Sequence, residues 1–227
     1  MSSSNTTPRR GRKGTQIVSA RGRIGDYRAG APTWLKALTE IITNSHQSYH
    51  TMMDEGHVFK EKQKIIVVAD MSSETFTVID YAGGIFGTWE DVEEILYKYS
   101  KFHKKTHTAQ GRSSFGRGMS DVLYRDYENV CPMRSKQKNG THFAVETFWD
   151  NKGTPEAEPT YEEIIDSNDP LMKLIPEHGT VIRFPWRSEY ERNNPFPNEI
   201  DLERKLSKYF ELKNVLNDEK IDVELIY

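Results

Sequence analysis

The sequence predicts an α+β protein in which helices cover one face of a mixed, mostly antiparallel sheet. Apolar residues recur at helical spacing in segments 34–56, 88–101 and 198–215, whereas segments 65–69, 76–79, 179–186 and 220–227 carry the short apolar or alternating runs typical of strands. A short turn joins the first two of these strands. With 227 residues, the chain can form one sizeable domain with small appendages.

The first 28 residues form a basic segment in front of an acidic body. They contain seven Lys/Arg residues and one acid, Asp26, while the rest of the chain holds 24 basic and 33 acidic residues. We predict an N-terminal arm over 1–28 and a folded domain over 29–227. Three roles fit the composition of the arm: a solvated tail, a contact with nucleic acid, and a contact with an acidic neighbouring subunit.

The composition argues against several classes of protein. No run of eighteen apolar residues occurs, so we predict no membrane span. The polar N-terminus lacks the apolar region of a secretory signal. The single cysteine, Cys131, excludes an internal disulfide framework and suits a reducing compartment. We therefore expect a cytoplasmic protein without membrane contact.

The first predicted helix follows Thr33, a good N-cap residue, and ends near Gly56. Its buried stripe is predicted to contain Leu38, Ile41, Ile42 and Tyr49. Two strands follow over 65–69 and 76–79, and the glycine-rich loop 81–87 comes directly after the second. A carboxylate at the end of that second strand therefore stands next to flexible backbone.

The middle of the chain is predicted to contain two more helices separated by a loop. The first is capped by Thr88 and has acids in its first turn, which its positive end stabilises. Segment 102–118 is polar and contains glycine, so we predict a mobile loop. The next helix begins immediately after Gly118.

The last third is predicted to contain three strands and one helix. Strand residues lie within 139–151, a short helical or loop insertion follows over 166–179, and a strand over 179–186 is stopped by Pro185. An amphipathic helix over 198–215 precedes a final strand over 220–227. The apolar side of this helix is predicted to contain Ile200, Leu202, Leu206, Tyr209, Phe210 and Leu212.

Two short motifs in the first half of the chain carry polar groups suited to a nucleotide. Glu40 and Asn44 lie four residues apart, so a helix places them one above the other on one face. Asp80 ends a strand and runs into Gly83 and Gly84. A carboxylate there can accept a hydrogen bond from an exocyclic amine, and glycine lets a flat ring lie against bare backbone.

Two further motifs follow in the second half. Gly116 and Gly118 precede a helix, where free backbone N–H groups favour phosphate. Gly179 and Thr180 open a late strand, and the threonine hydroxyl can donate or accept beside a ring. Each motif is weak by itself, so the order of the four and their structural setting carry the signal.

This order resembles the GHKL superfamily, the ATP-binding fold shared by gyrase B, the heat-shock chaperone ATPases, histidine kinases and MutL. The resemblance covers residues 30–186. "EIITN" resembles the family's N-box, "DYAGG" its adenine loop, "FGRG" its lid, and "GT" at 179–180 its late Gly-Thr pair. It implies a two-layer α/β sandwich of the GHKL type that holds ATP between the sheet and the helices beneath a lid. The helix and strand of 196–227 then follow this core.

The resemblance implies a role for each motif. Asn44 would bind the Mg²⁺ that bridges the phosphates, and Glu40 would act as general base on the attacking water. Asp80 would pair with the adenine amine, and Thr180 would reinforce that contact. Further nucleotide contacts are implied for Gly84, Ile85, Lys101, Ser114, Phe115, Gly116, Arg117, Gly118 and Met119. Lys101, another lid cation or another subunit would replace the phosphate-sensing lysine that gyrase and MutL take from a following domain.

Several positions depart from the family pattern. Gln47 stands where hydrolytic members often have an acid, Ala82 replaces a glycine of the adenine loop, and Ser113 replaces the first lid glycine. Histidine kinases usually have asparagine where this chain has Glu40. The sequence therefore fits a divergent member of the hydrolytic branch, which includes topoisomerase, chaperone, MutL and MORC types.

The implied function is Mg²⁺-dependent ATP binding and slow hydrolysis that closes the lid and promotes dimerisation. The chain would act as a homodimer or in a larger complex, in a DNA-processing or chaperone-like system. One alternative is a nucleotide-sensing module that does not hydrolyse ATP, as a subunit of a DNA-processing or defence complex. A weaker one is a protein kinase of the histidine-kinase type.

Two histidine pairs also have a spacing that can bind a metal on a helix. His46 and His50, and likewise His103 and His107, lie four residues apart. The first pair lacks the glutamate of the H-E-x-x-H motif, and the second falls in the predicted lid. From the sequence alone, solvated or packing histidines are favoured over a zinc site.

Overall fold

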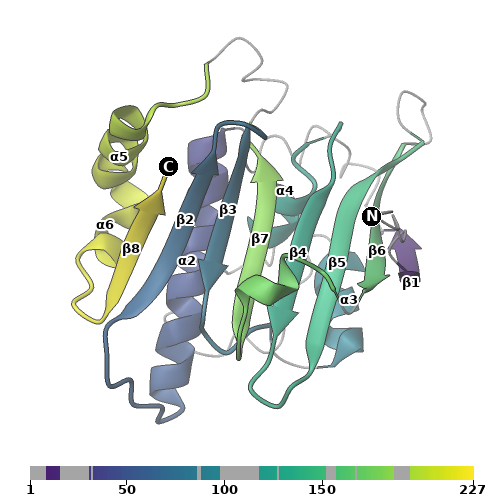
Figure 1. The fold of residues 1–227 in the computed structure, drawn as a ribbon, viewed down its shortest axis with the longest axis horizontal. Coiled ribbons are helices and arrows are strands. Elements are labelled where there is room, and N and C mark those ends of the chain that lie inside the picture. The colour runs from purple at the N-terminus through teal and green to yellow at the C-terminus, as the bar shows by residue number, and fades with distance from the viewer. Residues whose placement is uncertain are drawn as a thin grey trace, which may run out of the picture.

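One eight-stranded sheet forms the framework of the protein (Figure 1). The computed structural model describes residues 9–15, 31, 33–85, 88–97, 118–126, 128–151, 157–166, 168–186 and 195–227. The strand order is β1-β6-β5-β4-β7-β3-β2-β8. The strands are β1 Arg9–Thr15, β2 Gln63–Asp70, β3 Thr75–Asp80, β4 Cys131–Lys136, β5 His142–Asp150, β6 Glu158–Ile165, β7 Gly179–Pro185 and β8 Ile221–Ile226. Only β2 and β8 pair in parallel within this sheet, so the mixed, mostly antiparallel arrangement is confirmed.

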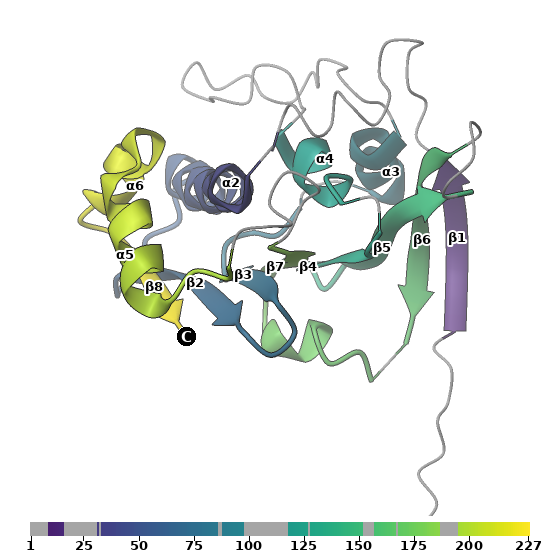
Figure 2. The same ribbon diagram turned by 90° about the horizontal axis from the view of Figure 1, so that it is seen from above.

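The α-helices lie on one face of the sheet (Figure 2). They are α2 Trp34–Asp54, α3 Trp89–Tyr97, α4 Gly118–Leu123, α5 Glu199–Lys208 and α6 Lys213–Leu216. The helix α2 lies between α6 on one side and α4 on the other, and the 3-10 turn η1, Met172–Leu174, covers part of the opposite face. None of the described helices is long and apolar enough to cross a membrane. The predicted α+β class is confirmed.

The helix α2 is built as its sequence predicts. Thr33 adopts extended backbone geometry and its hydroxyl accepts a hydrogen bond from the N–H of Lys36, which satisfies one free donor of the first turn. The predicted stripe is buried, since Leu38, Ile41, Ile42 and Tyr49 are each at most 2% exposed. Burial of such side chains contributes about 1.5–3 kcal/mol each, so packing fixes the rotation of α2 about its axis.

The central strands β3 and β7 determine which residues meet beside α2. Their antiparallel register pairs Asp80 with Thr180 and Ile79 with Val181. Ile79 and Val181 pack with Leu171 and Ile175 around η1, in a small core on the far face of the sheet. Because neighbours along a strand point to opposite faces, Asp80 and Thr180 project toward the helices.

Strand β4 was not predicted, because its sequence looks unsuitable for a central strand. Pro132 cannot donate a ladder hydrogen bond, but β4 pairs with β7 only from Met133 onward, so no bond to β7 is lost there. Arg134 is buried, and its guanidinium contacts Asp169 at 2.7 Å through both Nε and Nη2. A charge that would be costly alone is thus paired and hydrogen-bonded in the interior.

Strand β1 corrects the prediction of a separate arm over 1–28. Residues 9–15 of that segment pair antiparallel with β6 and form an edge of the sheet. Lys13 lies 3.1 Å from Asp150, and the Arg12 N–H donates to Glu163. The acidic neighbour that the basic segment contacts therefore lies in the same chain. Residues 1–8 and 16–30 lie outside the described structure.

The prediction of a single helix over 198–215 is wrong. It is divided into α5, the turn η3 (Phe210–Leu212) and α6, because Tyr209 adopts extended backbone geometry with ψ 116°. The break lets Leu212 and Val215 reach the core, whereas Ile200 and Phe210 are 76% and 85% exposed. Tertiary packing thus overrides the helical periodicity of the segment.

Candidate functional site

Asp80 is the buried polar centre of the predicted site. Only 4% of it is exposed, and it lies at the end of β3 under α2. The Ser45 hydroxyl donates to Asp80 Oδ2 at 2.7 Å, and the Ala82 N–H donates to Asp80 Oδ1 at 3.0 Å. The N–H of Thr180 also hydrogen bonds to this carboxylate. Ser45 directly follows Asn44, so this contact joins the predicted N-box to the predicted adenine loop.

Burial raises the pKa of Asp80 from 3.8 to about 6, although Ser45, the two N–H donors and the nearby His178 oppose the shift. The folded protein therefore holds the proton more tightly than the unfolded chain between these two values. By linkage, the stability contributed by the protonated acid is fully present below about pH 4 and is lost as pH rises through about 6.

This linkage gives a testable pH dependence. The free energy of unfolding of the wild type, minus that of Asp80→Asn, is expected to fall as pH rises from 4 to 7. The change would be about 3 kcal/mol for a shift of this size, since one pKa unit corresponds to about 1.4 kcal/mol. Urea denaturation of both proteins across this range measures it, and a pH-independent difference would contradict the assignment.

The backbone that follows Asp80 is held on both sides. The Ile85 N–H donates to Ser135 Oγ at 2.7 Å, and the Ile85 carbonyl accepts from Gln137 Nε2 at 2.8 Å. His178 Nδ1 lies 2.7 Å from the Ala82 carbonyl oxygen, so this nitrogen carries the proton and donates. Residues 80–85 are therefore a pre-formed surface.

Two glycines allow the chain to pass close to this surface. Gly84 has φ +75°, and a Cβ added to it would overlap the Lys136 carbonyl oxygen. Gly179 has φ +141°, and its Cβ would overlap the backbone oxygen of Asp80. Both positions therefore require glycine for conformation and for space.

Glu40 meets the start of α4 on the outer part of α2. A Cβ added to Gly118 would overlap Glu40 Oε2, so the glycine of the predicted lid motif touches the predicted general base. The other oxygen, Oε1, lies 2.9 Å from Lys36 Nζ, which also lies 2.7 Å from Glu211 Oε2. Burial opposes the charge on Lys36, but hydrogen bonds to Glu211 and Glu40 outweigh it and raise the pKa of Lys36.

Asn44 is half-buried on the same helical face as Glu40. Among the described residues, none makes a hydrogen bond to its side chain. Its carboxamide oxygen is of the ligand type that a hard cation prefers. Asn44 and Glu40 together offer one neutral and one anionic oxygen donor on this face of α2, and Glu40 lies beside Gly118.

The structure places several described members of the predicted set in contact with one another, in two groups. Glu40 meets Gly118, Asp80 meets Thr180, and Gly84 and Ile85 form the loop beside them. Met119 follows Gly118 on α4 and packs against the main core. Lys101, Ser114, Phe115, Gly116 and Arg117 lie outside the described residues.

Sequence reasoning missed Ser45, Lys36 and His178. Lys36 could have been found, because it lies four residues before Glu40 on a predicted helix, at the spacing of an ion pair. Ser45 follows Asn44 but lies on the sheet-facing side, where a serine carries no distinct signal. His178 directly precedes Gly179, and only the fold shows that it holds the Ala82 carbonyl.

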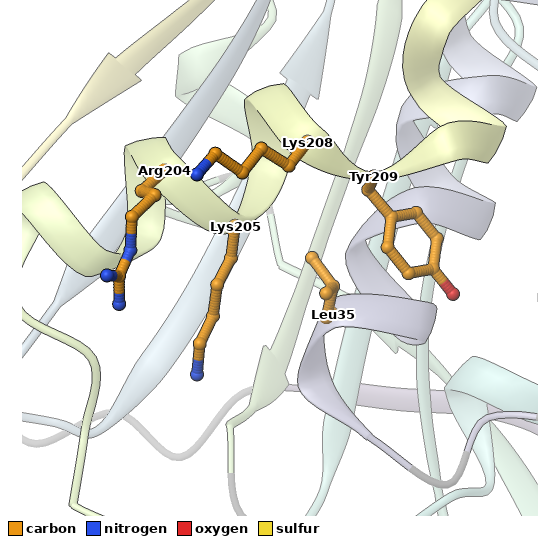
Figure 3. Close-up of a pocket in the computed structure, with 5 residues that line it drawn as sticks. All are labelled: Leu35, Arg204, Lys205, Lys208 and Tyr209. Carbon is orange, nitrogen blue, oxygen red and sulfur yellow. The ribbon is translucent and has the colours of Figure 1, made fainter.

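An open cleft of about 370 Å³ lies between the start of α2 and α5 (Figure 3). It is lined by Leu35, Arg204, Lys205, Lys208 and Tyr209. Arg204 pairs with Asp201 on the same helix, and Lys205 lies 5.3 Å from the ring centre of Trp34. None of the predicted site residues lines this cleft, so it stands apart from the candidate site.

Comparison with models of protein families finds no matching family, and comparison with curated proteins finds no similar sequence. The candidate site therefore stands on the residues and contacts described above.

The sequence predicts ATP hydrolysis with Glu40 as general base. Gly118→Ala is expected to reduce this predicted activity at least about tenfold, because the methyl group displaces the Glu40 carboxylate and small misplacements of a reacting group are costly. The displaced atoms are the end of a flexible side chain, so the melting temperature should stay close to that of the wild type. Gly84→Ala is the contrasting variant, because it strains backbone at φ +75° and should lower stability by about 1 kcal/mol or more. Phosphate release and thermal melts check both; unchanged hydrolysis in Gly118→Ala would contradict the placement of Glu40.

Proposed function

We propose that the protein binds ATP with Mg²⁺ and hydrolyses it slowly, as a divergent ATPase of the GHKL type. One observation carries the proposal: the Ser45–Asp80 hydrogen bond joins the strand-end carboxylate to the helix that presents Glu40 and Asn44. A site for the ring and a site for the phosphates would thereby lie on neighbouring parts of one rigid unit. This is the arrangement that the resemblance to the family implies.

Asp80 is the group proposed to recognise the adenine. Its carboxylate accepts hydrogen bonds from Ser45, Ala82 and Thr180, and it has further acceptor capacity for an exocyclic amine. The partner must be an amine, because an exocyclic carbonyl oxygen in the same place would be a second acceptor facing the carboxylate. The fixed backbone of residues 82–85 would support the ring.

Asn44 is the residue proposed to hold Mg²⁺. Its amide oxygen is a ligand of the kind that this cation prefers, and one protein ligand suffices because Mg²⁺ usually keeps several waters and bonds to phosphates. When bound, the cation would neutralise charge on the phosphate oxygens. The protein's own contribution is an oxygen donor on a helix whose orientation is set by its buried stripe.

Glu40 is proposed to accept a proton from the attacking water. It lies one turn before Asn44, and Gly118 allows α4 to approach it closely. Lys36 holds one of its oxygens, which orients the carboxylate but also occupies it. Turnover by the isolated chain is therefore expected to be slow. We also propose that ATP binding closes the predicted lid and promotes dimerisation. Nucleic acid is a further proposed partner.

Binding and turnover are tested separately. Calorimetric titration with ATP and Mg²⁺ is expected to give one site per chain, and phosphate release is expected to follow at a slow rate. Mass determination with a non-hydrolysable analogue should show dimers that are absent without nucleotide. Lack of any ATP binding by the folded chain would reject the proposal.

The alternative is a nucleotide-sensing module without useful hydrolysis. The observation that favours it is that both Glu40 oxygens have a close neighbour, since Oε1 lies 2.9 Å from Lys36 Nζ and Oε2 lies beside Gly118. Phosphate release with and without DNA and candidate partners separates the two functions. Release that stays at background in every condition, while ATP still binds, would establish the module.

A further inference from the structure

A cluster of three metal-binding side chains lies on another side of α2. His46 and His50 approach Asp218, which lies in the turn between α6 and β8. Asp218 Oδ2 is 2.9 Å from His46 Nε2 and 2.8 Å from His50 Nε2, and the two nitrogens are 3.2 Å apart. One donor atom from each residue therefore points at the same small volume.

Protons alone cannot satisfy all three contacts. An imidazole nitrogen carries either a proton or a lone pair, so it either donates or accepts. If both nitrogens donate to Asp218, the two N–H groups lie side by side, and the nitrogens stand 3.2 Å apart with no hydrogen bond between them. If one imidazole donates to the other, the accepting nitrogen has no proton for the carboxylate. At least one of the three short contacts is therefore unfavourable without a further group.

We propose that His46, His50 and Asp218 form a binding site for a divalent transition-metal ion, with zinc as the type case. A cation accepts a lone pair from all three atoms and removes the conflict. The three distances between the donor atoms also suit a zinc ion. The circle that passes through the three atoms has a radius smaller than a zinc–nitrogen bond of about 2.0–2.1 Å. One point can thus lie at bonding distance from all three atoms without moving them, and solvent would complete the coordination.

The ligand types separate this site from the magnesium site proposed at Asn44. Imidazole favours zinc and similar metals, whereas Mg²⁺ favours oxygen ligands. The two sites also lie on different sides of α2. His46 follows Asn44 by two residues, or about 200° around the helix axis. It contacts Asp218, which follows α6, whereas Glu40 lies beside Gly118 at the start of α4. The metal proposal does not depend on ATP binding.

The position of the site gives the ion a structural role. His50 and Asp218 are 168 residues apart in the chain, so the ion would fasten the C-terminal segment to α2. Cross-links that close long loops reduce the conformational entropy of the unfolded chain most. A bound ion also stabilises the folded state by mass action.

Titration of the full chain with ZnCl₂ in the presence of Mg²⁺ tests the proposal. We expect one zinc ion per chain, and a rise in melting temperature of about 5–10 °C at a hundredfold excess over Kd. His46→Ala combined with His50→Ala should weaken zinc binding at least a hundredfold, and the melt should lose its response to zinc.

Asp218→Asn provides a second variant that preserves the fold. Asp218 Oδ1 accepts a hydrogen bond from the Lys220 N–H, and asparagine can retain this contact while it loses the charged ligand. We expect its zinc affinity to fall at least tenfold. The exposed His142 offers a matched control, and His142→Ala should bind zinc as the wild type does.

The second histidine pair provides another control, because His103 and His107 have the same spacing as His46 and His50. Both lie outside the described residues. The double variant His103→Ala/His107→Ala should keep wild-type zinc affinity within about threefold. The proposal is overturned if the wild type binds no zinc, if the variant without His46 and His50 binds it unchanged, or if binding follows His103 and His107 instead.

Discussion

Asp80→Asn is expected to remove ATP binding while it stabilises the fold. Asparagine has nearly the same shape, and it can still accept from the Ala82 N–H and contact Ser45. Its amide group would place a donor where the carboxylate is proposed to accept from the adenine amine. The affinity for ATP should fall by about a hundredfold, since a hydrogen bond to a charged group contributes about 1.5–3 kcal/mol and the unpaired donors add a penalty.

The stability of this variant should move in the opposite direction. At pH 7.5 the wild type carries a charge on a buried carboxyl whose pKa is raised to about 6. Replacing it by a neutral amide is expected to raise the free energy of unfolding by about 1–3 kcal/mol at that pH. Such a trade between stability and function is typical of binding sites.

A matched control for this experiment lies at the other end of the β2–β3 hairpin. Asp70 ends β2 and accepts hydrogen bonds from Ser72 and Ser73 in the exposed turn. Asp70→Asn should leave ATP affinity unchanged. Calorimetry of both variants and thermal melts at pH 7.5 give the comparison. Wild-type ATP affinity in Asp80→Asn would reject Asp80 as the adenine-recognition residue.

Glu40→Gln is expected to bind ATP normally and to lose hydrolysis. Loss of a general base typically costs about 10²–10⁴ in rate, whereas the uncharged isostere keeps the packing against Gly118. We expect kcat to fall by at least a hundredfold and the dissociation constant of ATP to stay within about threefold. Glu40→Ala should give the same result, with a cavity beside α4.

The control shares the ion pair of Glu40 but not its position. Glu211 lies 2.7 Å from the same Lys36 ammonium, on η3 rather than beside α4. Glu211→Gln should therefore retain most of kcat. Single-turnover phosphate release, with binding measured separately, distinguishes the outcomes. Equal loss in both variants would indicate that charge balance around Lys36, rather than proton transfer at Glu40, limits turnover.

The parts that local chemistry determines were predictable. The cap at Thr33, the buried stripe of α2 and the strand that ends at Asp80 depend on residues close together in the chain. Asp80 and Thr180 were named from motifs, and the β3–β7 register places them opposite each other.

The parts that depend on distant partners were not predictable. Strand β4 needs Asp169 to neutralise its buried Arg134, and Asp169 is 35 residues away. For the histidines of α2 the sequence favours solvated or packing residues, since nothing near them in the chain indicates Asp218. Residues 9–15 were assigned to an arm because their charge suggested an external partner, whereas the acids that they contact lie on β5 and β6. Sequence patterns report local preference, and pairing across a sheet is a property of the whole fold.

The two outer strands of the described sheet carry opposite charges, and this has a consequence for crowded solutions. Arginine and lysine dominate β1, while β8 offers Asp222 and Glu224, which pair with Lys62 and Lys64. Two copies that met through the same rim would bring like charges together, which discourages a twofold dimer formed by pairing these edges. A stable twofold complex of this chain would therefore be expected to meet through its helical layer rather than by extending the sheet.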